Sequence, residues 1–261
     1  MNRLCILALA ILFVTKTSAT NIISGATCFE VVGNLENTVH LVESWYEGEH
    51  LVIPEHITWQ DSVYQVVSIS NLAFKRCTSL KTIEISSSVK SIAISAFIYC
   101  TKLEQIFVSK DNPNYCDIDG VLYTADHQNL LYFPCATKSK TFHIPENVRT
   151  IGTYAFFRCM GLEEVVLPPT LTRIGTAAFN GCHGLKSIEF PQCLESIDDY
   201  AFYDCPNLLE IRMLATHPVT IDKNSFSYQT SIEGNITLPS VLPPNVIQQY
   251  KRYGFVNVTT E

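Results

Sequence analysis

Residues 151–173 read IGTYAFFRCMGLEEVVLPPTLTR, and residues 174–196 read IGTAAFNGCHGLKSIEFPQCLES. The two stretches align without a gap, and the pattern continues from residue 197 as IDDYAFYDCPNLLEIRM. It also occurs earlier, from residue 69 (ISNLAFKRCTSLKTIEI) and from residue 92 (IAISAFIYCTKLEQIFV). The shared pattern is Ile-x3-Ala-Phe-x2-Cys-x2-Leu-x2-Ile-x-apolar, where the second Ile can be Val, and directly adjacent copies follow one another at a constant spacing. A fixed period of this length is typical of a solenoid built from stacked repeats.

Three columns of apolar side chains are shared by the five copies. They consist of Phe74, Phe97, Phe156, Phe179 and Phe202; Cys77, Cys100, Cys159, Cys182 and Cys205; and Leu80, Leu103, Leu162, Leu185 and Leu208. A single coil of this length cannot bury its apolar face alone, so neighbouring coils must stack to form a core. We therefore expect the phenylalanine and cysteine columns to be structural core.

Each copy also predicts its own local structure. The segment Leu-x2-Ile-x-apolar alternates apolar and polar residues, which indicates a short strand with one buried face. A second extended piece follows at Val89–Ile92, and equivalent pieces follow in later copies. The segment Ala-Phe-x2-Cys is expected to form a helical or 3-10 turn that places Phe in the core. The predicted fold is a β-rich repeat solenoid with short parallel strands and only a minor helical content.

Cys182 lies next to His183, a combination that can provide a thiolate nucleophile or part of a metal site. The cysteine repeats in every copy, whereas its neighbour does not: Thr78, Thr101, Met160 and Pro206 take the place of the histidine. The cysteine is therefore interpreted as a structural residue of the coil, because a small apolar thiol fits a buried turn. The histidine is interpreted as incidental.

The pairing of the cysteines can also be predicted. Equivalent residues on adjacent coils have parallel Cβ vectors, so their Cβ atoms stay about 5 Å apart, which is too far for a disulfide. We therefore expect a ladder of free thiols in the column. Cys116 and Cys135 lie outside the column and could pair with each other. Nine cysteines follow residue 19, an odd number, so at least one remains unpaired within the chain.

The 23-residue pattern resembles the BspA-like leucine-rich repeat family of bacterial-type cell-surface proteins. The resemblance covers roughly residues 66–215, through the Ala-Phe, Cys and Leu positions named above. It implies a leucine-rich repeat fold and a role in surface adhesion or in recognition of a host matrix. A fold by itself does not fix a function, so these implications are expectations.

The first residues predict export. Arg3 precedes an apolar run from Leu4 to Val14, and Thr17-Ser18-Ala19 is typical of a signal-peptide cleavage site. We predict a signal peptide at residues 1–19 and a soluble protein that is secreted, surface-located or periplasmic. No later stretch is long and apolar enough to predict insertion into a membrane.

The remaining residues divide into predicted segments. Residues 20–65 are strand-rich and lack the repeat, so they are expected to cap the solenoid at residues 66–215. An insert at about residues 109–146 contains a predicted hairpin of Gly120–Tyr123 and Leu130–Phe133. Residues 216–261, with a short helix predicted at 246–255, are expected to form a C-terminal cap.

The composition and motifs argue against several functions. The formal net charge is −7, and it becomes −9 without residues 1–19, which hold Arg3 and Lys16 and no acid. Such a charge argues against nucleic acid as a partner. No catalytic, cofactor or metal motif is present: Asp117-Ile118-Asp119-Gly120 lacks the remaining ligands of a calcium loop, and His50 and His56 have no third ligand nearby. The sequence predicts a binding protein rather than an enzyme.

The predicted strands expose one outward-facing surface. Its residues are Thr82, Glu84, Gln105, Phe107, Glu164, Val166, Ser187, Glu189, Glu210 and Arg212. Phe107 and Val166 are apolar where the repeat does not require it. Exposed aromatic residues favour recognition; the alternative for Phe107 is that the insert covers it. We expect this face to bind an extracellular protein or glycan. The alternatives are a structural component of a cell-envelope assembly and an enzyme inhibitor.

Overall fold

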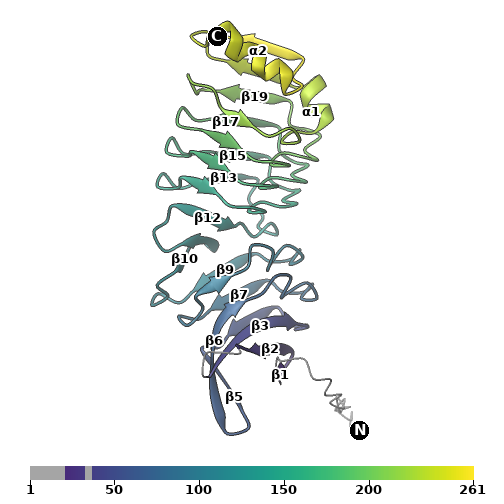
Figure 1. The fold of residues 1–261 in the computed structure, drawn as a ribbon. Coiled ribbons are helices and arrows are strands. Elements are labelled where there is room, and N and C mark those ends of the chain that lie inside the picture. The colour runs from purple at the N-terminus through teal and green to yellow at the C-terminus, as the bar shows by residue number, and fades with distance from the viewer. Residues whose placement is uncertain (1–20, 33–36) are drawn as a thin grey trace, which may run out of the picture.

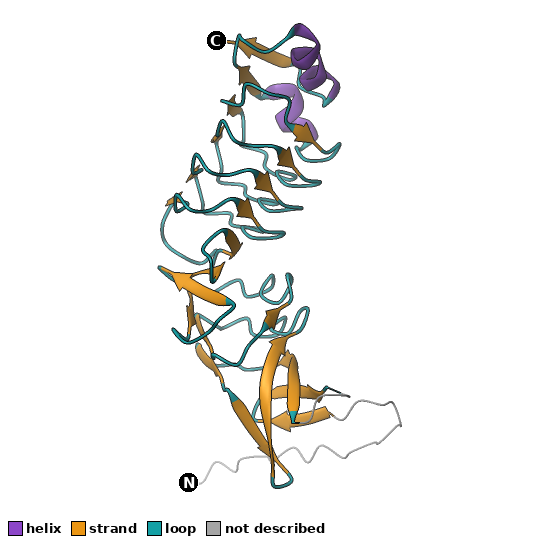
Figure 2. Ribbon diagram, turned by 60° about the vertical axis from the view of Figure 1, so that its left-hand side comes forward, coloured by secondary structure: helices purple, strands orange, loops and turns teal. Residues whose placement is uncertain are grey.

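The computed structural model describes residues 21–32 and 37–261, so the predicted signal peptide lies outside the described residues. The chain forms an elongated stack of coils, with the longest strands at the N-terminal end and two helices at the C-terminal end (Figures 1 and 2). The β-rich repeat solenoid predicted from the sequence is confirmed.

A twisted sheet forms the N-terminal end of the stack. Its strands, in spatial order, are β1 (Asn21–Ser24), β2 (Thr27–Val31), β3 (Thr38–Ser44), β6 (Ser62–Ile69) and β5 (His56–Trp59). The β5–β6 hairpin turns at Gln60 and Asp61, which both have left-handed backbone conformations. Strand β6 also pairs in parallel with β8 (Ser91–Ile92), and this pairing joins the sheet to the repeats.

The main strands of the coils lie along one side of the stack. They form three parallel sheets: β4 (His50–Ile53), β7 (Thr82–Ile85) and β9 (Gln105–Val108); β13 (Thr141–His143) and β15 (Glu164–Val166); and β17 (Ser187–Phe190), β19 (Glu210–Met213), β21 (Asn235–Leu238) and β22 (Asn257–Thr260). Within each strand the buried residues alternate with outward-facing ones, as the sequence pattern predicts. This parallel ladder begins at β4 and ends at β22, inside the segments that we predicted as caps.

A second row of strands lies on the other side. It consists of β10 (Tyr115–Ile118), β11 (Val121–Thr124), β12 (Asn129–Tyr132), β14 (Thr150–Ile151), β16 (Arg173–Ile174), β18 (Ser196–Ile197) and β20 (Thr220–Ile221). Strands β11 and β12 form the hairpin predicted in the insert, and β10 adds a third antiparallel strand to it.

Two helices lie near the C-terminal end (Figure 2). Helix α1 (Tyr228–Glu233) begins after Ser227, whose side chain accepts a hydrogen bond from the backbone N–H of Thr230. Helix α2 (Pro244–Arg252) begins with proline, which needs no N–H donor at that position, and buries Val246 and Tyr250. Helix α2 corresponds to the helix predicted at residues 246–255, whereas α1 was not predicted.

Turns with left-handed residues take the place of the expected helical or 3-10 turn. The residue before Ala-Phe is left-handed at Tyr154, Ala177 and Tyr200, and the residue before Cys is left-handed at Arg158 and Asp204. A positive φ cannot continue a right-handed helix. The segment is therefore two successive turns, closed by hydrogen bonds from the N–H of a residue to the carbonyl three residues earlier.

The phenylalanine column forms a stack of rings inside the solenoid. The ring of Phe179 lies 4.7 Å from that of Phe156 and 5.0 Å from that of Phe202, with interplanar angles of 10° and 7°. The backbone links the same coils, because the N–H of Phe179 donates to the carbonyl of Ala201 at 2.7 Å. The stack continues on the next coil with Phe226, whose ring lies 5.2 Å from that of Phe202.

The free cysteines of the column have a structural contact that explains their position. The thiols of Cys182 and Cys205 each donate to the carbonyl oxygen of the phenylalanine one coil earlier, Phe156 and Phe179, at 3.1 Å. Both thiols are fully buried, and burial raises the pKa of Cys205 to about 12. These cysteines are therefore thiols rather than thiolates at neutral pH, which makes them poor nucleophiles.

The insert divides the hydrophobic interior into two cores. One core contains buried residues from Ile22 to Tyr132, and the other contains buried residues from Val121 to Phe255. Strand β11 contributes to both, because Leu122 belongs to the first core while its neighbours Val121 and Tyr123 belong to the second. Alternate side chains of this strand thus face opposite cores, so the insert is a shared layer between them.

Tyr132 continues the hydrogen-bond pattern of the cysteine column across this layer. Its hydroxyl donates to the carbonyl of Phe97 at 2.9 Å, the type of acceptor that a column cysteine uses in the regular coils. Replacing Tyr132 by phenylalanine should remove this hydrogen bond, leaving the carbonyl only the backbone N–H of Cys100 at 2.8 Å as a donor. We expect the free energy of unfolding to fall by about 1 kcal/mol. Urea unfolding would measure the difference, and an unchanged midpoint would contradict the role of the hydroxyl.

The predicted ladder of free thiols is wrong at one coil, and the pairing of Cys116 with Cys135, which the sequence left open, does not form. Cys159 is not a free thiol of the column but forms a disulfide with Cys135, with Cα atoms 4.6 Å apart. Cys116 is free. The reason lies in the spacing: Cys135 follows Phe133 by two positions, whereas Cys159 follows Phe156 by three. The parallel-Cβ argument holds only for equivalent positions, and Cys135 is displaced from its column by one position.

Candidate functional site

The predicted ligand face consists of outward-facing residues on the main strands. Every residue of this set is exposed except Thr82, which is half-buried. Parallel pairing places equivalent members side by side: Glu84 is in register with Phe107, and Glu189 with Arg212. The residues of the predicted ligand face fall into two groups, an N-terminal group on β7 and β9 and a C-terminal group on β15, β17 and β19.

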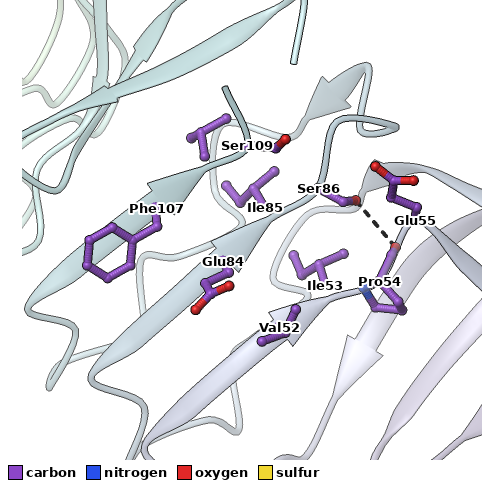
Figure 3. Close-up of a pocket in the computed structure, with 10 residues that line it drawn as sticks. Val52, Ile53, Pro54, Glu55, Glu84, Ile85, Ser86, Phe107 and Ser109 are labelled. Atoms are coloured by element: carbon purple, nitrogen blue, oxygen red, sulfur yellow. Dashed lines mark hydrogen bonds between the residues drawn. The ribbon is translucent and has the colours of Figure 1, made fainter. Parts of the chain in front are cut away.

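A groove crosses the C-terminal ends of β4, β7 and β9 (Figure 3). It has a volume of about 290 Å³. Its floor contains Ile53 and Ile85, inward-facing strand residues that are 1% exposed. The groove exists because β4 pairs in parallel with β7, which extends the strand face one coil beyond the first sequence repeat.

Two apolar side chains stand exposed at this groove. Val52 is 59% exposed and Phe107 is 40% exposed, and both lie at the groove's edge, on either side of Glu84 (Figure 3). The charged residues that line the groove are Glu55 and Glu84, and no lysine, arginine or histidine lines it. The groove thus combines apolar contact area with uncompensated negative charge.

The C-terminal group of the face is more polar. Arg212 donates to Glu261 at 2.6 Å and to Glu189 at 3.1 Å, and the hydrogen bond with Glu261 is the main cause that raises the pKa of Arg212. Beside this group, Glu163 accepts hydrogen bonds from Lys140 and Lys186, which lower the pKa of Glu163 to about 2. Most charges here already have partners within the chain, so they are less available to a ligand.

The other candidates from the sequence do not assemble into a site. Cys182 is buried, whereas the ring of His183 lies near the surface, 3.0 Å from the carboxylate of Asp204. Asp117 accepts a hydrogen bond from the backbone N–H of Val108 at 2.8 Å, which is a structural role. Nothing in residues 21–32 and 37–261 gathers three or more His, Cys, Asp or Glu side chains in a metal-binding arrangement. In the same residues, no helix has the length and hydrophobicity to span a membrane.

Sequence reasoning missed the contribution of β4 to the groove. Val52 and Glu55 precede the first repeat, so alignment of the copies did not include them. The segment HLVI at residues 50–53 does alternate like a main strand, and this was the available signal. Phe133 was missed as a member of the phenylalanine column, although it precedes Phe156 by one full period of the repeat and its ring is 4.8 Å from that of Phe156.

The repeats of this chain match a known family of repeat proteins. The family model for the BspA type leucine rich repeat region matches residues 54–117 and 131–257 in six copies. The chain belongs to the BspA-type leucine-rich repeat family. The match includes the segment with Ser225 and Phe226, which occupy the Ala-Phe position of one further coil, because the carbonyl of Ser225 accepts from the N–H of Phe202.

Solved structures of bacterial proteins are similar to this BspA-type chain. A leucine-rich repeat protein from Eubacterium ventriosum is 25% identical, with a TM-score of 0.59 over 74% of this chain and 52% of that protein. This chain therefore corresponds to about half the length of the Eubacterium protein. A leucine-rich cell surface protein from Faecalibacterium prausnitzii is 17% identical, with a TM-score of 0.47 over 92% of this chain and 99% of that one. No curated protein sequence matches the chain.

Proposed function

We propose that this protein is an exported, non-enzymatic binding protein that recognises an extracellular protein through the groove across β4, β7 and β9. The observation that carries the proposal is the pair of exposed apolar side chains, Val52 and Phe107, beside acidic residues that have no basic residue in the same groove. Apolar anchors surrounded by polar residues are typical of recognition surfaces. The predicted signal peptide and the repeat family support an extracellular location.

The groove indicates the chemistry of its partner. Apolar side chains of the partner would pack on Val52 and on Phe107, and Lys or Arg side chains would approach Glu84 between them and Glu55 beside them. The charge of the whole chain, −7, favours the approach of a basic surface as well. A segment of a basic protein therefore fits this groove better than a neutral or acidic glycan.

The double substitution Val52→Ser and Phe107→Ser tests the proposal. The protein would be screened against immobilised extracellular-matrix proteins and glycans, and each bound ligand would be titrated by surface plasmon resonance. We expect at least one basic protein to bind. The double variant should bind that protein with an affinity at least tenfold lower, because both apolar anchors are lost.

The matched control is Val241→Ser with Val256→Ser, which removes two exposed valines outside the groove. It should bind like the unchanged protein. Binding that survives the groove variant would place recognition elsewhere on the chain. Binding to glycans alone would contradict the proposed partner, and stable association with envelope proteins alone would favour the scaffold alternative.

A further inference from the structure

A second pocket opens on the strand side, where the insert separates the two cores. Val121, Phe133 and Phe142 form its apolar walls together with Pro134, and Glu104 and Asp119 provide its charged groups. Its volume is about 240 Å³. The sheet of β4, β7 and β9 ends at β9, and β13 belongs to another sheet, so the pocket lies at a discontinuity of the strand ladder.

The pocket partly exposes one side chain that packs against the core, Phe142. Phe142 is paired in register with Val165 and occupies the inward-facing position of its strand. The residues at this position in other coils, Ile106, Val165 and Ile188, are at most 4% exposed. Phe142 is only half-buried, although its ring contacts those of Phe133 and Phe156 at 4.7 Å and 6.0 Å. The insert thus leaves an aromatic part of the core open to solvent.

The size of the pocket limits what can occupy it. Sites for small molecules usually have volumes of about 300–1,000 Å³. A pocket of about 240 Å³ lies below that range, so it suits a single side chain rather than a cofactor or an oligosaccharide.

The charge of the pocket identifies the kind of side chain. Neither Glu104 nor Asp119 takes part in an ion pair within the described part of the chain. Lys81 and Lys140, which could otherwise neutralise this region, are paired with Glu49 at 2.8 Å and Glu163 at 2.6 Å. No basic residue lines the pocket. Two free carboxylates beside aromatic rings match a cation carried on an apolar stem.

We propose that this pocket receives an arginine or lysine side chain of the protein partner. The proposal rests on the proposed function and extends it. It adds a second contact on the strand side, outside the groove, that recognises a positive charge of the partner. The aliphatic stem packs against Phe133 and Phe142, and the cationic head reaches Glu104 and Asp119. The Cys135–Cys159 disulfide holds the chain next to Pro134, and so fixes one wall of the pocket.

The test uses probes that carry only the side chain in question. Nα-acetyl-arginine N-methylamide and its lysine equivalent would be titrated into isotope-labelled protein, and the methyl signals of Val121 and the ring signals of Phe142 would be followed by NMR. The neutral control is Nα-acetyl-citrulline N-methylamide, which has nearly the shape of the arginine probe without its charge. We expect saturable shifts with a basic probe and at least tenfold weaker binding of citrulline.

A charge variant of the protein completes the test. Glu104→Gln with Asp119→Asn should lower the affinity for the basic probe at least tenfold. The control Glu146→Gln with Asp111→Asn changes the net charge equally at exposed residues that do not line the pocket, and it should bind normally. Equal binding of citrulline, full binding by the pocket variant, or no shift at Val121 and Phe142 would each overturn the proposal. Because no partner protein is used, failure here is distinguishable from failure of the groove variant.

Discussion

Replacing Phe179 by alanine is expected to lower the free energy of unfolding by about 3–5 kcal/mol. Its side chain is fully buried, and its ring is stacked between those of Phe156 and Phe202. Alanine removes both ring contacts and leaves a cavity that the neighbouring coils cannot close, since backbone hydrogen bonds hold them at a fixed spacing. The loss is a large fraction of the total stability of a typical protein, which is about 5–15 kcal/mol.

Urea unfolding followed by circular dichroism would measure this loss. The matched control is Phe107→Ala, because Phe107 is the same residue type but is 40% exposed on the strand face. The control should change stability by less than about 1 kcal/mol. If both substitutions cost the same, the stacked rings of the column would not be the main source of stability in the coils.

The constant period of the repeat was enough to predict most of the fold. Fixed Ile, Phe, Cys and Leu positions identified the buried side chains, and the alternation of apolar and polar residues identified the face of each strand. The outward-facing residues of the candidate site followed from the same alternation. These features are local to one coil and are repeated, so each copy supports the interpretation of the others.

The features that sequence reasoning missed depend on departures from the repeat. The left-handed conformations at Tyr154 and Arg158 are imposed by stacking of the coils, since these residue types do not favour a positive φ. Val52 contributes to the groove only because β4 pairs with β7 from outside the repeats. The pocket at Phe142 exists because the insert interrupts the ladder, and the geometry of an interruption cannot be read from the regular copies.

Removing the disulfide by changing Cys135 and Cys159 together to serine should lower the free energy of unfolding by about 2–4 kcal/mol. The bond closes a loop between residues 24 positions apart and joins the insert to the next coil. Both cysteines lie in or against the second core, so the bond stabilises the junction between the insert and that core. In a stack where each coil contacts only its neighbours, we expect the loss to be greatest at this junction.

The measurement is unfolding in urea with and without dithiothreitol. The unchanged protein should lose stability when reduced, and the double variant should be insensitive to the reductant. Cys116→Ser is the control, because Cys116 is a free, half-buried thiol of the same insert, and its replacement should change stability by less than about 1 kcal/mol. A midpoint that dithiothreitol does not shift would mean that the disulfide contributes little here, and that the ring contacts of Phe133 with Phe142 and Phe156 hold the insert on the next coil. In that case the pocket wall at Pro134 would also remain fixed without the disulfide, and basic probes would bind the reduced protein as well as the oxidised one.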